Sequence, residues 1–361
     1  MGHRLHRRAL LGAGVLVALS ACSGGDEEEV TRPVHNEKVG IAIPFHVLDA
    51  MDDQTLSSHL DWLAKVGITW LRFDFYWSSI EPSRGEHEWS GTDRLVRASR
   101  QKGLSILGVL QTMPDWARKG QGTSHAFGPR SEEQRELFAA FATACASRYT
   151  GQVDCWEVWN EPNLVAFWGP KPDASDYIKL LKVAFTAVKG ANPASTVVTG
   201  GLGGAAASPD DVKADVFVEK MLSRRGGAIG SFDAFADHPY SNKQTGTVDG
   251  RLSSQPRLRQ RLDDAGLSKV QLWGTETGAP TGGTDGVLLD GSQAEAEKRQ
   301  AALWRDTYAH WRSIHDTGPL FWYTLLDVTA PDTEDDTSNH FGLYRADGTP
   351  KPVVAAVETG G

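Results

Sequence analysis

Cysteine is scarce in this sequence of 361 residues and occurs only at Cys22, Cys145 and Cys155. These residues lack the spacing of a metal site, and the His-Glu-x-x-His pattern of zinc proteases does not occur either. We therefore expect no metal and no other cofactor. In an oxidising compartment Cys145 and Cys155 would be able to form a disulfide, and a pair of buried free thiols is the equal alternative.

The sequence also has no apolar stretch that is long enough to cross a bilayer near its start, because the run Ala9–Ala21 is too short. An excess of positive charge is missing as well. The formal net charge is −9, and it becomes −12 if Arg4, Arg7 and Arg8 are removed with a signal peptide. This charge argues against nucleic acid or another polyanion as a partner, and a neutral ligand fits better.

The first residues have the pattern of an export signal. Basic residues at His3–Arg8 precede the apolar run, and Leu19-Ser20-Ala21-Cys22 resembles a bacterial lipobox, in which the cysteine is lipidated. We expect a signal peptide at 1–21, lipidated Cys22 followed by a flexible acidic tether at 22–38, and a lipid anchor on the outer face of the bacterial cytoplasmic membrane or cell envelope. Either general or twin-arginine export is compatible with Arg7 and Arg8.

From residue 39 to 358, strand-like runs alternate with amphipathic helical stretches, without a linker or an internal repeat. The predicted strands are 39–44, 69–75, 104–110, 154–159, 196–199, 232–237, 270–275 and 320–326. The predicted helices are 56–66, 92–102, 132–148, 175–189, 212–224, 256–264, 293–313 and 352–357. About eight strand-helix units in roughly 320 residues predict a single (β/α)8 TIM barrel, an α/β fold. We expect this barrel to be a monomer.

Two of the predicted strands end in a glutamate. Cys155–Asn163 reads Cys-Trp-Glu-Val-Trp-Asn-Glu-Pro-Asn, and Pro162 should stop the strand at Glu161. Val270–Gly278 places Glu276 in the same way before a glycine. Because active sites of such barrels lie at the carboxyl ends of the strands, the two carboxyl groups should meet there. Taken alone, each glutamate is better explained as a solvated residue that closes a strand.

The run Trp-Asn-Glu-Pro-Asn at 159–163 resembles the retaining glycoside hydrolases of clan A, most closely families 39 and 5. The resemblance implies that Glu161 is the acid/base and Glu276 the nucleophile of a double displacement. Their carboxyl groups should then lie about 5–5.5 Å apart, against about 6.5–9.5 Å in an inverting enzyme. Asn160 should donate a hydrogen bond to the sugar 2-hydroxyl; capping of the following loop is the alternative.

The same resemblance assigns further residues to a substrate-binding cleft. Arg72 should lie beneath the nucleophile and keep it ionised, and a structural ion pair with Asp74 or Glu81 is the alternative. Glu81 itself should shape its loop. Trp77 and Trp116 should offer flat faces to sugar rings, although ordinary packing explains either residue equally well.

Two later strand ends carry the remaining expected site residues. By resemblance, His238 contacts sugar hydroxyls and Tyr240 donates a hydrogen bond to the nucleophile. A buried histidine satisfied by backbone groups is the alternative for His238. Trp322 matches the strand-eight tryptophan that forms the floor of the subsite where cleavage occurs, and core packing is the alternative.

The expected function is hydrolysis of O-glycosidic bonds in an oligo- or polysaccharide, which makes a carbohydrate the main partner. A transglycosylase that remodels envelope glycan would use the same covalent intermediate, with a sugar acceptor in place of water. A sugar-binding lipoprotein on a barrel that no longer cuts is an alternative from a different class, although both glutamates are present.

Overall fold

The computed structural model describes residues 38–119, 127–204, 208–241, 248, 250–283, 292–328 and 336–359. The predicted signal peptide at 1–21, Cys22 and the tether up to residue 37 lie outside these residues. None of the helices in the described ranges has both the length and the apolar character needed to cross a membrane.

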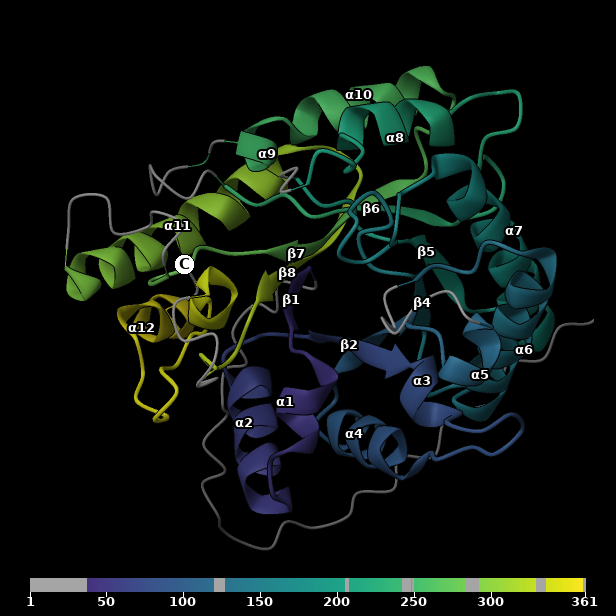
Figure 1. Cartoon of the computed structure of the whole chain (residues 1–361). Helices are drawn as coiled ribbons and strands as arrows, with labels where there is room; N and C mark the ends of the chain where they lie inside the picture. Colours follow the sequence, from purple (N-terminus) through teal and green to yellow (C-terminus); the bar gives the residue numbers. More distant parts are fainter. Residues whose placement is uncertain are drawn as a thin grey trace, which may run out of the picture. The chain divides into compact units, whose positions relative to one another are not determined.

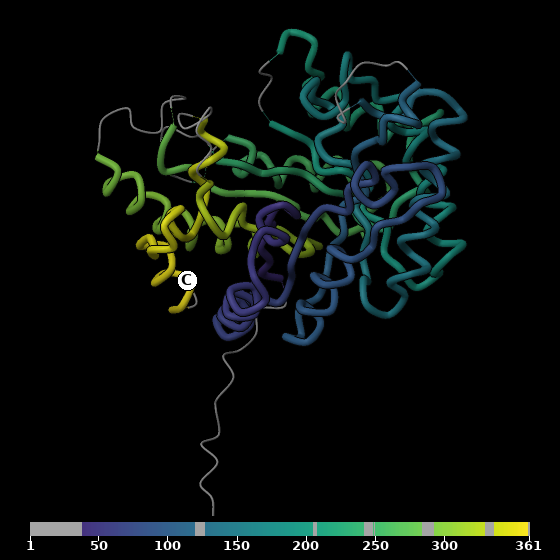
Figure 2. The backbone as a smooth tube through the Cα atoms, turned by 60° about the horizontal axis from the view of Figure 1, so that its bottom comes forward, coloured from purple at the N-terminus to yellow at the C-terminus, as the bar shows by residue number. Residues whose placement is uncertain are grey.

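Eight parallel strands close into a barrel in sequence order, and the last strand pairs with the first (Figure 1). They are β1 (Val39–Ala42), β2 (Trp70–Tyr76), β3 (Ser105–Gln111), β4 (Cys155–Val158), β5 (Thr196–Thr199), β6 (Ala234–Asp237), β7 (Gln271–Thr277) and β8 (Thr317–Tyr323). Figure 2 shows the purple start of the described chain beside the late strand β8, where the barrel closes. The predicted (β/α)8 fold is confirmed.

Helices surround the barrel, and α6, α7 and α8 follow one another along one side of it (Figure 1). The longer helices are α2 (Asp53–Lys65), α4 (Ser90–Gln101), α6 (Glu132–Arg148), α7 (Ala174–Ala191), α8 (Ala214–Met221), α10 (Gln255–Asp264), α11 (Gln293–Ser313) and α12 (Pro352–Glu358). The short ones are α1 (Phe45–Asp49), α3 (Trp77–Ile80), α5 (Asp115–Arg118), α9 (Gly250–Ser253) and the 3₁₀ turn η1 (Thr337–His340). Helices α6 and α11 have the predicted bounds.

The strands separate two apolar layers. Side chains on one face of each strand fill the barrel interior, among them Leu107, Cys155, Val198, Trp273 and Phe321. The other face packs against the helices in a larger core. Strands buried on both faces read as continuous apolar runs, which is why the sequence pattern located them.

The two described cysteines are free and buried thiols. Cys155 lies in the barrel interior and Cys145 lies in the layer between strands and helices, so the sheet separates them. Of the two predicted alternatives, the disulfide is wrong and the free thiols are confirmed. Burial raises the pKa of Cys155 to about 12.

The strand before Glu161 is shorter than predicted. It ends at Val158, and Trp159 (φ 69°) and Glu161 (φ 41°) have left-handed backbone conformations. Hydrogen bonds from Trp159 N to Leu110 O (2.9 Å) and from Glu161 N to Gly201 O (3.0 Å) hold this segment to the neighbouring strands. Left-handed conformations cost non-glycine residues about 1–3 kcal/mol, so they persist only where the surroundings impose them.

Candidate active site

A cavity of about 200 Å³ lies at the carboxyl ends of the strands. Strands β1, β2, β3, β7 and β8 and the loop after β4 contribute to it, as expected for a barrel of this kind. It contains four of the predicted site residues, namely Arg72, Asn160, Glu161 and Glu276. The rest of its lining is Ala42, Ile43, Pro44, His46, Phe73, Asp74, Tyr76, Gln111, Phe167 and Tyr323.

The two predicted carboxyl groups converge in this cavity. One oxygen of Glu161, one ring nitrogen of His238 and one oxygen of Glu276 lie within 4.8 Å of one another. Both glutamate side chains are mostly buried, with 13% and 14% of their surface exposed. This cluster has atoms that would suit a metal ion. The same atoms already contact one another or the side chains of Arg72 and Tyr240.

Glu276 is held as a carboxylate by three neighbours. Arg72 Nη1 lies 2.6 Å from its Oε1, Tyr240 Oη donates to its Oε2 at 2.8 Å, and His238 Nδ1 lies 3.6 Å from Oε2. Burial alone would raise the pKa of Glu276, but the charges of His238 and Arg72 and the tyrosine hydrogen bond outweigh it and lower this pKa. The predicted Tyr240 hydrogen bond is present, and Arg72 has its predicted place.

Arg72 is fixed by a third glutamate, Glu157, which the sequence analysis missed. Glu157 Oε2 accepts from Arg72 Nε at 2.6 Å, and its Oε1 accepts from Arg72 Nη2, Gly201 N and Thr275 Oγ1 at 3.3, 2.9 and 3.1 Å. Its side chain is fully buried in the barrel. Burial opposes the charge on Arg72, but Glu157 and Glu276 raise the pKa of the guanidinium further. A charged residue in the middle of an otherwise apolar strand was the available signal.

Asn160 is oriented by the same arginine. Its Oδ1 accepts from Arg72 Nη2 at 2.8 Å, so the NH₂ group remains available as a donor on a side chain that lines the cavity. The residue is 6% exposed. This orientation suits the predicted donation to a sugar hydroxyl better than capping of the following loop, since the NH₂ group is the only donor of the side chain.

His238 lies between the two glutamates. Its Nδ1 is 2.8 Å from Glu161 Oε1, and the buried Nε2 has no partner among the described residues. Burial favours the neutral ring, but Glu276 and Glu161 together raise the pKa of His238. Its close approach requires Gly201, because a Cβ on that residue would lie 2.2 Å from the ring. The ring does not line the cavity, so the structure shows contacts to carboxylates where sugar contacts were expected.

The aromatic residues after β2 and β3 do not line the cavity. Trp77 is fully buried, donates from Nε1 to Glu81 Oε2 at 2.8 Å and stacks on Phe141. The sugar-contact prediction for Trp77 is therefore wrong, because α3 turns its ring into the helix layer. Trp116 is half-buried and donates to the Glu81 carbonyl at 2.9 Å. Its sugar contact stays a prediction. Glu81 also accepts from Gly85 N, so it shapes its loop as expected.

The expected floor of the cleavage subsite is displaced by one residue. Trp322 is fully buried against Trp304 of α11, with ring centroids 5.0 Å apart. Tyr323, which follows it, lines the cavity. Successive side chains of a strand point to opposite faces, so a shift of one position moves the assignment from cleft to core. The prediction that Trp322 lines the cleavage subsite is therefore wrong, and Tyr323 lies at the cavity in its place.

A second polar network without a role in the sequence analysis lies on the β2 and β3 side of the cavity. Asp74 Oδ2 accepts from Phe45 N at 3.2 Å, and its Oδ1 accepts from Gln111 Nε2 at 2.5 Å. Burial raises the pKa of Asp74, although Arg72 opposes this effect. Asp74, Gln111 and Tyr76 thus present hydrogen-bonding groups to whatever occupies the cavity.

Part of the sequence matches a known family. Residues 65–167 match the sequence profile of glycosyl hydrolase family 10. Over 90 residues the chain is 24% identical to endo-1,4-beta-xylanase A of Phanerodontia chrysosporium, a match that covers 24% of this chain and 20% of that enzyme. The profile match contains Arg72, Glu157 and Glu161 and ends before Glu276.

Several solved structures have the same fold. A family 39 glycoside hydrolase from Bacteroides cellulosilyticus WH2 is 25% identical, with a TM-score of 0.70 over 90% of this chain and 63% of its own. A GH39 beta-xylosidase from Caulobacter crescentus is 20% identical, with a TM-score of 0.63 over 90% of this chain and 71% of its own. Xylanase 10B from Thermotoga petrophila RKU-1 is 17% identical, with a TM-score of 0.61 over 90% and 93%.

The chain thus spans less than two thirds of the Bacteroides enzyme and, by the matched segment, a fifth of the fungal xylanase. Together these similarities place the fold among the GH10/GH39-like TIM barrels of clan A.

The hydrogen bond from Tyr240 predicts a shift in pH dependence. Tyr240→Phe removes a donor that stabilises ionised Glu276, so the pKa of Glu276 rises. The acidic limb of the kcat/KM profile should then move to higher pH, by about one pH unit for a hydrogen bond to a charged group. Tyr308→Phe is the matched control, because that buried hydroxyl donates to the Gly40 and Leu320 carbonyls. If the acidic limb of the kcat/KM profile lies at the same pH in Tyr240→Phe and Tyr308→Phe, Tyr240 does not stabilise ionised Glu276.

The contacts of Glu157 predict a role in positioning Arg72. Every described partner of Glu157 is a hydrogen-bond donor, so in Glu157→Gln the NH₂ group must face one of them and turn Arg72 away from Glu276. We expect kcat to fall at least about tenfold and the acidic limb to change, with a loss of roughly 3 kcal/mol in the free energy of unfolding.

Glu297→Gln supplies the control for this variant. Glu297 of α11 is also buried and forms an ion pair of two hydrogen bonds with Arg345. Neither residue lines the candidate active-site cavity. It should lose similar stability in thermal or urea unfolding and keep kcat at temperatures where it is folded. A folded Glu157→Gln protein with the kcat of the Glu297→Gln protein would show that Glu157 is structural only.

Proposed function

We propose that this barrel is a retaining glycoside hydrolase of clan A that cleaves an oligo- or polysaccharide. The observation that supports it most is the approach of Glu161 and Glu276 to within 4.8 Å in one cavity. Carboxyl groups whose oxygens come this close suit direct attack by a carboxylate, at about 5–5.5 Å, better than inversion through a water molecule, at about 6.5–9.5 Å.

The two glutamates have different roles because their partners differ. Glu276, which Arg72 and Tyr240 keep ionised, attacks the anomeric carbon and forms a glycosyl ester as the bond to the leaving oxygen breaks. Glu161 gives its proton to that oxygen. Glu161 then takes a proton from water, the hydroxyl oxygen bonds to the anomeric carbon, and the ester to Glu276 breaks. Both inversions together retain the configuration.

The electrostatic surroundings assist the first step. The transition state develops positive charge on the sugar ring, and Glu276 supplies a negative charge next to it in a site that is largely closed to solvent. Asn160 directs its amide NH₂ group into the same cavity, where it donates to the 2-hydroxyl. These groups are positioned before substrate arrives, because Arg72 bonds to both of them.

A xylan-like glycan is the proposed substrate class. The named relatives include an endo-1,4-beta-xylanase, a beta-xylosidase and a xylanase with bound xylobiose. An exo-beta-1,4-mannosidase from Opitutaceae bacterium strain TAV5 is also structurally similar, with a TM-score of 0.63 and 15% identity. β-linked substrates are therefore the first to test, with xylosides ahead of mannosides.

Replacement of the nucleophile tests the chemistry. Glu276→Ala should lose nearly all hydrolysis of an aryl β-xyloside, because no glycosyl ester forms. Added azide should restore turnover in the cavity left by the side chain and give an inverted glycosyl azide. Glu161→Ala should instead give a retained glycosyl azide, since the ester with Glu276 still forms. NMR of the anomeric proton distinguishes the two products.

Glu295→Ala is the control for these variants, because Glu295 is an exposed residue of α11 that pairs with Lys298. It should hydrolyse the xyloside at the wild-type rate. An azide product of the same configuration from both cavity variants would contradict the assigned roles. If the wild-type protein hydrolyses an aryl mannoside but not the aryl xyloside, only the proposed substrate class is contradicted.

We further propose that the enzyme is exported and anchored through a lipid on Cys22. This proposal rests on the lipobox-like sequence and concerns residues that the structure does not describe. In a bacterial host, the protein should fractionate with membranes, and mass spectrometry should find an acylated Cys22 as the first residue. Cys22→Ser should abolish both results, and Cys145→Ser should preserve them. An unmodified or uncleaved N-terminal peptide in the wild type would rule out this anchor.

A further inference from the structure

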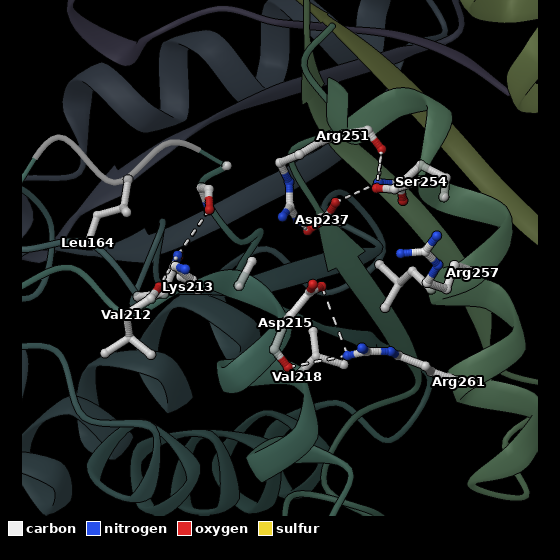
Figure 3. Close-up of a pocket in the computed structure, with 16 residues that line it drawn as sticks. Leu164, Val212, Lys213, Asp215, Val218, Asp237, Arg251, Ser254, Arg257 and Arg261 are labelled. Carbon is white, nitrogen blue, oxygen red and sulfur yellow. Dashed lines mark hydrogen bonds and ion pairs between the residues drawn. The ribbon is translucent and has the colours of Figure 1, made fainter. Parts of the chain in front are cut away.

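A second and larger cavity, of about 310 Å³, lies beside the candidate active site. It opens between α8 and the α9–α10 segment, and Figure 3 shows Arg257 and Arg261 extending from α10 toward α8. Its inner wall comes from the loops after β4 and β5, with Leu164, Gly203 and Gly204. No role was assigned to it above.

The cavity is rich in positive charge. Lys213, Arg251, Arg257 and Arg261 line it, and Asp215 and Asp237 are the acids among its described lining residues. Both acids have partners. Asp237 pairs with Arg251, and Asp215 Oδ1 lies 3.9 Å from Arg261 Nη1. This local excess of cations is notable in a chain whose formal net charge is −9.

Two of the four cations are left without counterions. Within the described residues, the side chains of Arg257 and Lys213 form no hydrogen bond or ion pair, and both residues are exposed. A pair of uncompensated cations at the edge of a concave site attracts an anion, and a guanidinium is suited to carboxylate and sulfate groups through two parallel hydrogen bonds.

Two further polar atoms of the cavity lining have no partner among the described residues. Arg251 Nε and Gln255 Oε1 are buried and form no hydrogen bond with this part of the chain. Gln255 is 1% exposed, and its amide nitrogen donates to Asp237 Oδ2 at 2.8 Å. Each unsatisfied polar atom costs stability, so a polar ligand in the cavity would remove that cost. Burial lowers the pKa of Arg251 to about 10, so its guanidinium stays charged at neutral pH.

The cavity adjoins the acid/base residue. A Cβ on Gly203 would lie 3.0 Å from the carboxyl carbon of Glu161, and one on Gly204 would lie 2.1 Å from Arg251 Cδ. Both glycines line the larger cavity, so its wall lies next to the Glu161 carboxyl group and the Arg251 side chain. The smaller cavity contains Glu276 and so holds the sugar that becomes attached, whereas the larger one is lined by Gly203, next to the Glu161 carboxyl group, and not by Glu276.

We propose that the larger cavity binds the leaving-group side of the substrate and that this part carries an acidic sugar residue, with a carboxylate or a sulfate ester as its anion. The inference rests on the proposed glycosidase function, because Glu161 protonates the leaving oxygen and thus marks the leaving-group side. Arg257 and Lys213 attract the anion, and Arg251 Nε and Gln255 Oε1 bond to the polar groups of the ring.

The experiment measures binding without catalysis. The full chain is titrated by calorimetry with sodium glucuronate, glucose 6-sulfate, glucose and inorganic sulfate. At least one of the two acidic sugars should bind about tenfold more tightly than glucose or inorganic sulfate, and higher salt should weaken it. Tight glucuronate points to a carboxylate and tight glucose 6-sulfate to a sulfate ester; both outcomes support the proposal.

The variant Lys213→Gln/Arg257→Gln should lose this preference, because it removes the two unpaired charges and breaks no described contact. Arg305→Gln is the matched control. It replaces an exposed arginine of α11 outside the cavity and should bind as the wild type does. Equal affinity for glucose and both acidic sugars, tighter binding of inorganic sulfate than of either, or an unchanged preference in the double variant would each overturn the proposal.

Hydrolysis of aryl glycosides separates this proposal from the one on which it rests. The aryl group needs no acidic binding site, so an active enzyme without a preference for acidic sugars would refute the cavity assignment alone. A protein that binds acidic sugars but cleaves no aryl glycoside would refute the proposed hydrolase function, and with it the assignment of the cavity to a leaving group.

Discussion

The candidate site depends on one buried guanidinium. Arg72 lies in the barrel with 5% of its side chain exposed, and it bonds to Glu157, Glu276 and Asn160 at once. Burying a charge is costly unless its partners replace the lost contacts with water. Here burial lowers the pKa of Arg72, but Glu157 and Glu276 outweigh this effect and raise it. The guanidinium is planar and its donors point in fixed directions. Its hydrogen bonds therefore also orient the Glu276 carboxylate and the Asn160 amide.

The two proposed catalytic glutamates differ in what surrounds them. Glu276 has an arginine, a phenol and a histidine within reach, so its ionised form is favoured despite burial. Glu161 has His238 as its described side-chain partner, lines the smaller cavity and lies next to Gly203 of the larger one. The proposed roles follow from these surroundings: Glu276, kept ionised, is the nucleophile, and Glu161, beside the wall of the larger cavity, is the acid next to the leaving oxygen.

Several site residues were predictable because their signals are local. Pro162 and the glycines after Glu276 break strands, and the strands themselves are apolar runs, so the carboxyl groups could be assigned to the same end of one barrel. The tryptophans were harder. Whether Trp77 faces a sugar or the core depends on the direction of a single turn of α3, and whether Trp322 or Tyr323 reaches the cavity depends on the register of β8 with β1.

By itself, the sequence determined the alternation of strands and helices, the end of the barrel where chemistry occurs, and the pair of acids, because these depend on periodicity and on residues that interrupt it. Only the tertiary structure decided that Glu157 supports Arg72, that Cys145 and Cys155 stay apart, and that the wall of a cationic cavity lies next to Glu161. Those features join residues from different strands and helices, and their geometry depends on how the closed barrel packs in three dimensions.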